Sequence, residues 1–154
     1  DMPTSRGLGD VYKRQGAAMM DGISGHAGLF GNSLDIAKIL QLFLQKGSYA
    51  NEKFFDEKFF DLFNFRHFKE KKVRRGIGFD KPELDPDDPN TCGCASDKSF
   101  GHYGFTGSVA WVDPETEIIY VFLSNRTFPD ENNNSLSEFN IRTEIQKLVH
   151  EAFN

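Results

Sequence analysis

The chain of 154 residues is 38% hydrophobic and 27% charged, which is typical of one folded domain and excludes a disordered chain. Its formal net charge of -5 argues against a nucleic-acid partner, because contacts to the phosphate backbone need a basic surface. No apolar run is long enough to predict a transmembrane segment, and the 16 phenylalanines predict more apolar surface than so short a chain can bury alone.

The N-terminal segment differs in character from the rest. Residues 1–15 show neither helical nor strand periodicity. The stretch from Ser5 to Gln15 resembles the translation of a sequencing adapter, so we interpret residues 1–15 as a disordered extension and leave them out of the fold prediction. On this interpretation, residues 16–154 are the C-terminal part of a domain that is entered midway, at Gly16.

Two helices are predicted in the first half. A glycine-rich stretch over 16–31 favours tight turns and lacks the ending of a phosphate loop. A helix over 35–44 follows, with Asn32 or Ser33 as N-cap and Gly47 as its C′ residue. Its apolar stripe consists of Ile36, Ile39, Leu40, Phe43 and Leu44. The second helix is predicted over 56–64, with Phe55, Phe59, Leu62 and Phe63 on one side.

The middle of the chain is predicted to be mostly irregular. The basic run 69–75 fits a solvated loop or strand edge, 76–79 fits a short strand, and 80–98 fits a surface loop. Cys92 and Cys94 lie in this loop. We interpret them as two thiols, because a disulfide across one residue would be strained and a metal site would need further ligands that the sequence does not place nearby.

The last third predicts an antiparallel sheet followed by a helix. Strands are expected over 100–105, 108–112 and 118–123, with a turn over 113–116. The third strand is continuously apolar, which indicates burial on both faces and therefore helices on both sides of the sheet. A final helix begins at Ser135 or Ser137. Its predicted apolar face consists of Ile141, Ile145, Leu148, Val149 and Ala152. The predicted fold class is α+β.

Several segments resemble one enzyme family. They are Gly25–Phe30 with the helix Asp35–Leu44, then Phe100–Ser108, Trp111–Glu115, Val121–Arg126 and Pro129. Together they resemble the C-terminal part of class C-like serine hydrolases, the family of β-lactamases and penicillin-binding proteins. The similarity spans residues 16–154 and is greatest to the serine-hydrolase domain that some bacteria carry behind a family 3 β-N-acetylglucosaminidase. It implies an incomplete β-lactamase/transpeptidase-like sandwich and a periplasmic or cell-envelope location.

The resemblance also implies a site. In this family, three motifs supply a nucleophilic Ser with its Lys, a second proton-transfer group, and a Lys-Thr-Gly or His-x-Gly strand. His102-Tyr103-Gly104 matches the third. His102 would hold a substrate carboxylate and tune proton transfer, and Gly104 would let the substrate approach the backbone. The N–H of Phe105 would be one arm of the oxyanion hole. Tyr103, Thr106 and Gly107 would line the substrate site, and no metal or cofactor is expected.

The chain departs from the family at the other two motifs. No Ser-x-x-Lys occurs in it, and Tyr49-Ala50-Asn51 matches the second motif only in letters, after the helix rather than before it. We interpret that match as a coincidence in a loop. Because acyl-enzyme chemistry needs its nucleophile, we expect the chain alone to be inactive and to need the N-terminal half of its domain as a partner.

Two functions remain open. The first is part of a serine hydrolase that cleaves an amide or ester in a peptidoglycan peptide, a β-lactam or a simple ester. The second is a non-catalytic accessory module of a cell-wall enzyme. A metal-dependent hydrolase is disfavoured, because the four histidines show no ligand spacing. Of these, His26 is expected to be structural, while His67 and His150 are expected on the surface.

Overall fold

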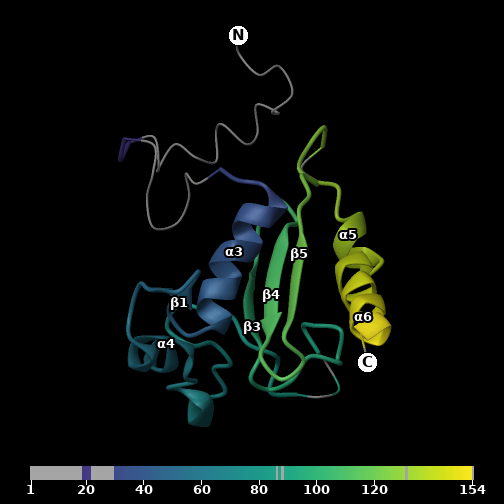
Figure 1. Cartoon of the computed structure of the whole chain (residues 1–154). Helices are drawn as coiled ribbons and strands as arrows, with labels where there is room; N and C mark the ends of the chain where they lie inside the picture. Colours follow the sequence, from purple (N-terminus) through teal and green to yellow (C-terminus); the bar gives the residue numbers. More distant parts are fainter. Residues whose placement is uncertain (1–18, 22–29, 86, 88, 131, 154) are drawn as a thin grey trace.

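A three-stranded antiparallel sheet with helices against both faces forms the centre of the molecule (Figure 1). The computed structural model describes residues 19–21, 30–85, 87, 89–130 and 132–153. The sheet consists of β3 (Phe100–Tyr103), β4 (Val109–Asp113) and β5 (Ile118–Phe122), in that order. Helix α3 (Ser33–Leu44) contacts one face and α6 (Ile141–Phe153) the other. The predicted α+β class is confirmed, although β3 ends at Tyr103 rather than at Phe105.

The two faces of the sheet bury different apolar clusters, because successive strand side chains point to opposite faces. Phe100 and Val112, which are fully buried, pack with Leu40 of α3. Trp111 and Tyr120 belong to the cluster on the α6 face. The predicted coverage of β5 on both faces is confirmed: Ile119 and Val121 contact the α3 cluster, whereas Phe122 contacts the α6 cluster.

Helix α3 is fixed at both ends. The Asn32 side chain accepts a hydrogen bond from the Asp35 N–H at 3.0 Å, as expected of an N-cap. The C-terminal turn differs from the prediction, because Lys46, with φ 51°, is the left-handed C′ residue, and Gly47 follows it. Glycine is required at 47 for another reason: at φ +102°, an added Cβ would lie 2.3 Å from the Phe55 carbonyl oxygen.

A hairpin and a short helix follow α3. The hairpin pairs β1 (Ser48–Tyr49) with β2 (Glu52–Lys53), and its two turn residues, Ala50 and Asn51, both have positive φ. Tyr49-Ala50-Asn51 therefore lies in a hairpin and its turn. Helix α4 (Glu57–Asn64) occurs where it was predicted, but its buried residue is Phe60. The predicted side of α4 is largely exposed, with Phe59, Leu62 and Phe63 at 44–50%.

The segment before β3, residues 69–98, lacks the strand predicted at 76–79, and its loop is more buried than predicted. Residues 76–79 form no strand, and the contact of this segment with β3 is the bridge from Asp80 to Gly101. A short 3-10 helix (Lys69–Lys71) begins the basic run. Residues 81–98 are irregular, as predicted, but Lys81 and Thr91 are each only 4% exposed. This loop therefore folds back against the sheet and α6 instead of lying wholly on the surface.

The C-terminal helix is divided into two. Helix α5 (Ser135–Glu138) ends before Asn140, which has φ 51°, and α6 begins at Ile141. The predicted apolar face is wrong at Leu148, which is 63% exposed. The fully buried positions of α6 are Gln146 and His150, because the helix faces the Cys92 loop as well as the sheet. None of the helices in the described part of the chain is both long and apolar enough to cross a membrane.

Candidate functional site

The His102-Tyr103-Gly104 motif lies at the end of an edge strand. In β3, His102 is in register with Ala110 and Tyr103 with Val109 of β4. The outer side of β3 is bridged through Gly101, which exchanges hydrogen bonds of 2.8 and 3.0 Å with Asp80. His102 is exposed and shares the strand face of Phe100, the face toward α3. An exposed imidazole at the edge of a sheet can contact a ligand that approaches from solvent.

The Arg75 guanidinium contacts this imidazole. Its Nη2 lies 3.5 Å from His102 Nδ1, and both side chains are exposed. A guanidinium can only donate, so a hydrogen bond here would use Nδ1 as acceptor, in the tautomer whose Nε2–H is a donor. The pair therefore presents two kinds of hydrogen-bond donor together, which suits a carboxylate. The sequence prediction missed Arg75, because its basic run carries no signal that one member returns to β3.

Packing requires glycine at one of two positions near the motif, Gly101, but not at the other, Gly104. An added Cβ at Gly101 would lie 2.3 Å from the Ala110 carbonyl oxygen and 2.4 Å from Trp111 Cε3, so internal packing requires glycine there. At Gly104 the nearest atom to an added Cβ would be the Ser108 carbonyl oxygen, at an ordinary 3.5 Å. The fold itself does not require glycine at 104. The space there is consistent with the predicted close approach of a ligand.

Residues 104–108 form a turn that Arg126 holds in place. The N–H of Gly104 donates to the Ser108 carbonyl at 2.7 Å. Arg126 donates from its backbone N–H to Thr106 O at 2.9 Å and from Nε to Phe105 O at 3.0 Å. Its guanidinium also lies 4.8 Å from the centroid of the Phe105 ring. These contacts make a preorganised turn next to His102. The role of the Phe105 N–H in an oxyanion hole stays a prediction, as do the roles of Thr106 and Gly107.

The structure does not bring Tyr103 to the side of His102. Its ring lies in the α6-side cluster, with its centroid 5.4 Å from that of Trp111. Its hydroxyl donates to the Asn90 carbonyl at 2.5 Å, and burial raises the pKa of Tyr103 to about 12. The proposed substrate contact of Tyr103 therefore gains no support from its position. His26, which the sequence predicts to be structural, lies outside the described residues.

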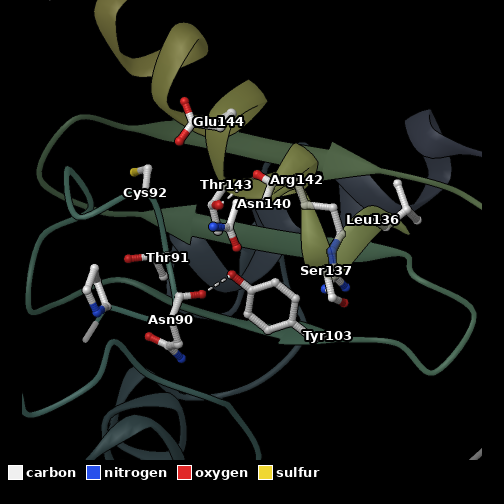
Figure 2. A pocket seen from close by; sticks show the side chains of 11 residues that line it. Asn90, Thr91, Cys92, Tyr103, Leu136, Ser137, Asn140, Arg142, Thr143 and Glu144 are labelled. Atoms are coloured by element: carbon white, nitrogen blue, oxygen red, sulfur yellow. Dashed lines mark hydrogen bonds between the residues drawn. The ribbon is translucent and has the colours of Figure 1, made fainter. Parts of the chain in front are cut away.

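A separate cavity of about 420 Å³ opens on this α6 side of the sheet (Figure 2). Figure 2 shows the hydrogen bond from Tyr103 to Asn90 among the lining side chains, with Cys92 on the loop next to Thr91. The remaining lining residues are Pro89, Thr91, Leu136, Ser137, Asn140, Arg142, Thr143 and Glu144. Since His102 faces the other way, this cavity is distinct from the site that the motif predicts.

The Cys92 loop also departs from the prediction. Cys92 and Cys94 form a disulfide rather than two thiols, with their Cα atoms 5.1 Å apart. This separation lies in the usual range for a disulfide, because the loop turns at Gly93, which has a positive φ of 71°. His150, predicted on the surface, is 2% exposed and lies beside this pair. His67 is exposed, as predicted.

Comparison with known proteins identifies relatives. Residues 2–142 match the family described as Beta-lactamase. This range includes residues 2–15, which lie outside the described part of the structure. The chain is 35% identical over 131 residues to "N-acetylmuramyl-L-alanine amidase" of Bacillus subtilis (strain 168), covering 82% of the chain. It is 36% identical over 118 residues to "Putative D-alanyl-D-alanine carboxypeptidase" of Salmonella enteritidis PT4, covering 77%. The chain spans only 29% and 27% of the lengths of these proteins.

Proposed function

This chain belongs to the β-lactamase family of serine hydrolases, which is related to cell-wall enzymes, and we propose that it supplies one wall of an acyl-enzyme site for a peptidoglycan-derived peptide. This strand wall consists of His102 and Gly104 at the end of β3, with Arg75 beside them. The reaction is cleavage of an amide or ester through a covalent serine ester. The finer proposal is that the chain corresponds to the serine-hydrolase domain behind a family 3 β-N-acetylglucosaminidase. A periplasmic or cell-envelope location is part of the same proposal.

The observation that carries the proposal is the position of Arg75 beside His102. The two exposed side chains lie 3.5 Å apart beside the edge strand, and Gly104, where an added Cβ would meet only ordinary contacts, follows His102 by two residues. A peptide with a free carboxylate fits this wall: the guanidinium and the imidazole N–H donate to its oxygens, while its backbone lies close to Gly104. The name of one relative above, a putative D-alanyl-D-alanine carboxypeptidase, refers to cleavage at the carboxyl end of a peptide.

His102 has a second task in the proposed reaction. An imidazole at the wall can exchange a proton with the network that activates the nucleophile and protonates the leaving amine. The turn at 104–108, held by Arg126, would place the Phe105 N–H toward the developing oxyanion. The chain contains no Ser-x-x-Lys, so the nucleophile and its base would come from sequence outside these 154 residues. The chain by itself is therefore a binding wall and not an active enzyme.

A chimera tests this function directly. The part of the Bacillus subtilis amidase that lies outside its match would be fused ahead of residues 16–154. We expect the chimera to hydrolyse N-acetylmuramyl-L-alanine peptides. His102→Ala should reduce kcat/KM by about 10²- to 10⁴-fold, as expected for loss of a proton-transfer group. Arg75→Gln should mainly raise KM, because the guanidinium contributes binding.

Two controls keep the test decisive. His67→Ala changes an exposed histidine far from β3 and should leave kcat/KM unchanged. If the chimera does not fold by circular dichroism, the same peptides can be titrated onto the isolated chain while the His102 ring resonances are followed by NMR. A folded chimera in which His102→Ala retains full activity, or an isolated chain whose His102 resonances do not move, would refute the proposal.

A further inference from the structure

Cys92, Cys94 and His150 form a cluster that the proposed hydrolase function does not use. Each offers one ligand atom, a sulfur or a ring nitrogen, and these three atoms lie within 4.8 Å of one another. The cysteines come from the loop before β3, while His150 comes from the last turns of α6. The fold thus brings together three residue types that bind thiophilic metal ions, although His150 is far from the cysteines in sequence.

His150 is a ligand without a partner in this environment. The residue is 2% exposed, and its Nδ1 is buried with no hydrogen-bond partner. Buried polar atoms in proteins are almost always paired, and each exception calls for a cause. A metal ion bound through Nδ1 would supply the missing partner.

The surrounding residues hold the loop against the helix. Gln146, one helical turn before His150, accepts a hydrogen bond from the Cys92 N–H on its Oε1 at 3.1 Å. The Cys94 N–H donates to Cys92 Sγ at 3.3 Å, which fixes the two cysteines relative to each other. Because Gln146 is 1% exposed, this attachment lies in the interior. The cluster is therefore held in position before any ligand arrives, as expected of a built metal site.

We propose that Cys92, Cys94 and His150 form a redox-gated site for a thiophilic divalent cation, with Zn²⁺ as its probe. In the structure the two sulfurs are joined as a disulfide, which is the oxidised form. Tetrahedral zinc with two sulfurs and one nitrogen places these donors about 3.6–3.8 Å apart. Donors that already lie within 4.8 Å need only small movements once the S–S bond is broken.

The gating step is a two-electron reduction. A dithiol reductant gives two electrons and two protons to the disulfide, so the S–S bond breaks, two thiols form, and the reductant becomes a disulfide. Zn²⁺ then displaces both thiol protons and binds two thiolates and the neutral imidazole. Three protein ligands leave the fourth position for water. Cys94 is exposed and Cys92 lines the 420 Å³ cavity, so both the reductant and the ion have a route to the sulfurs (Figure 2).

The site is independent of the strand wall at His102. It lies on the α6 side of the sheet, whereas His102 lies on the α3 side. A chain that binds no metal would consequently not contradict the proposed hydrolase function, and a chain without that function would not contradict the metal site. In an oxidising envelope the disulfide form would prevail, so metal loading would report exposure of the protein to a reducing thiol pool.

Equilibrium dialysis of the full chain against Zn²⁺ tests the proposal. One sample is reduced with a phosphine that is then removed without air, and a matched sample is oxidised with diamide. We expect one Zn²⁺ per reduced chain and none per oxidised chain. Co²⁺ in place of Zn²⁺ should give thiolate-to-metal charge-transfer absorption and the visible bands of a tetrahedral site, again only after reduction.

Three variants assign the ligands. Cys94→Ser, at an exposed position, should weaken Zn²⁺ binding by roughly tenfold or more and reduce the charge-transfer band. His150→Gln should weaken binding similarly while it keeps that band, and His67→Gln should match the wild type. The proposal is overturned if the reduced chain binds no Zn²⁺ beyond the oxidised one, if Cys94→Ser binds normally, or if a folded His150→Gln binds normally. Should His150→Gln fail to fold, Cys94→Ser and the reduced-to-oxidised comparison decide.

Discussion

Arg74 and Asp80 form a two-pronged ion pair at the edge of the sheet, with Nε–Oδ1 at 2.8 Å and Nη2–Oδ2 at 2.9 Å. The Asp80 side chain is 6% exposed, and its backbone bridges to Gly101 of β3. Arg74 is the residue directly before Arg75, so this pair fixes the chain that carries Arg75 to His102. The strand wall thus depends on an ion pair that belongs to the fold.

The first prediction concerns this pair. Arg74→Met should leave the Asp80 carboxylate buried without its partner and reduce the free energy of unfolding by about 1–3 kcal/mol. Equilibrium denaturation with urea measures the change. Lys38→Met is the matched control, since the Lys38–Asp35 pair is exposed on both sides and should contribute less than about 0.5 kcal/mol. Equal losses in the two variants would show that Asp80 does not need Arg74.

The second prediction concerns the isolated chain as a catalyst. Without a Ser-x-x-Lys sequence, it should hydrolyse neither a chromogenic β-lactam nor a short-chain nitrophenyl ester above the uncatalysed rate. The matched control is His102→Ala, measured at the same protein concentration. Turnover by the wild-type chain that exceeds that of His102→Ala would mean that the chain carries a nucleophile the family motifs do not reveal.

The third prediction contrasts two glycines only three positions apart. Gly101→Ala would force a Cβ to within 2.4 Å of the Ala110 carbonyl oxygen and Trp111, so it should destabilise the fold by about 1–3 kcal/mol. Gly104→Ala meets only ordinary contacts and should change stability by less than about 1 kcal/mol. Thermal denaturation of both variants gives the comparison. If Gly104→Ala is the more destabilising of the two, the space at Gly104 is not free for a ligand.

The fourth prediction concerns the apolar side of α4. Phe59, Leu62 and Phe63 are 44–50% exposed, and Phe59 and Phe63 line a hollow of about 390 Å³ whose other walls are almost wholly phenylalanine. Such a surface favours association in water. In size-exclusion chromatography the chain should therefore elute as a species larger than a monomer. Leu62→Lys should shift the elution toward the monomer, and Leu148→Lys, at an exposed position of α6, should shift it less. A sharp monomer peak with a cooperative melt for the unmodified chain would contradict this.

The sequence predicted most of the elements correctly, because their signals are local. The apolar periodicity of α3, the cap at Asn32 and the long apolar run of β5 need only neighbouring residues to be interpreted. The failures concern long-range packing. Which side of α4 is buried depends on Phe79 and Phe100, whose rings lie 5.9 and 5.1 Å from that of Phe60 and come from other parts of the chain.

The sites show the same division. The sequence singled out His102 and Gly104 because their motif is contiguous, and their roles stay predictions. Arg75, in contrast, reaches His102 from 27 positions earlier in the chain. The short strand predicted at 76–79 fails because those residues serve to carry Arg74 and Asp80 into their pair. The helical spacing of α6 places His150 next to its apolar face. Only the fold shows that the Cys92 loop covers this residue.

The last prediction uses Lys81, which is 4% exposed and donates from Nζ to the Asn64 side chain at 3.1 Å and to the Lys98 carbonyl at 3.0 Å. Burial lowers the pKa of Lys81 to about 8, from an ordinary value of 10.5. Between these two pH values the unfolded chain binds more protons at this lysine than the folded chain does. The lysine's contribution to stability therefore rises with pH, on the order of 1 kcal/mol per pH unit.

Above pH 10 an opposing contribution begins, because the pKa of Tyr103 is raised to about 12 and the unfolded chain then loses that proton first. The free energy of unfolding, measured by urea denaturation at intervals from pH 7 to 11, should accordingly rise from about pH 8 and turn over above pH 10. Lys81→Met should abolish the rise and leave the later fall, while Lys38→Met, on the exposed surface of α3, should preserve both. A rise that persists in Lys81→Met would assign the pH dependence to another group.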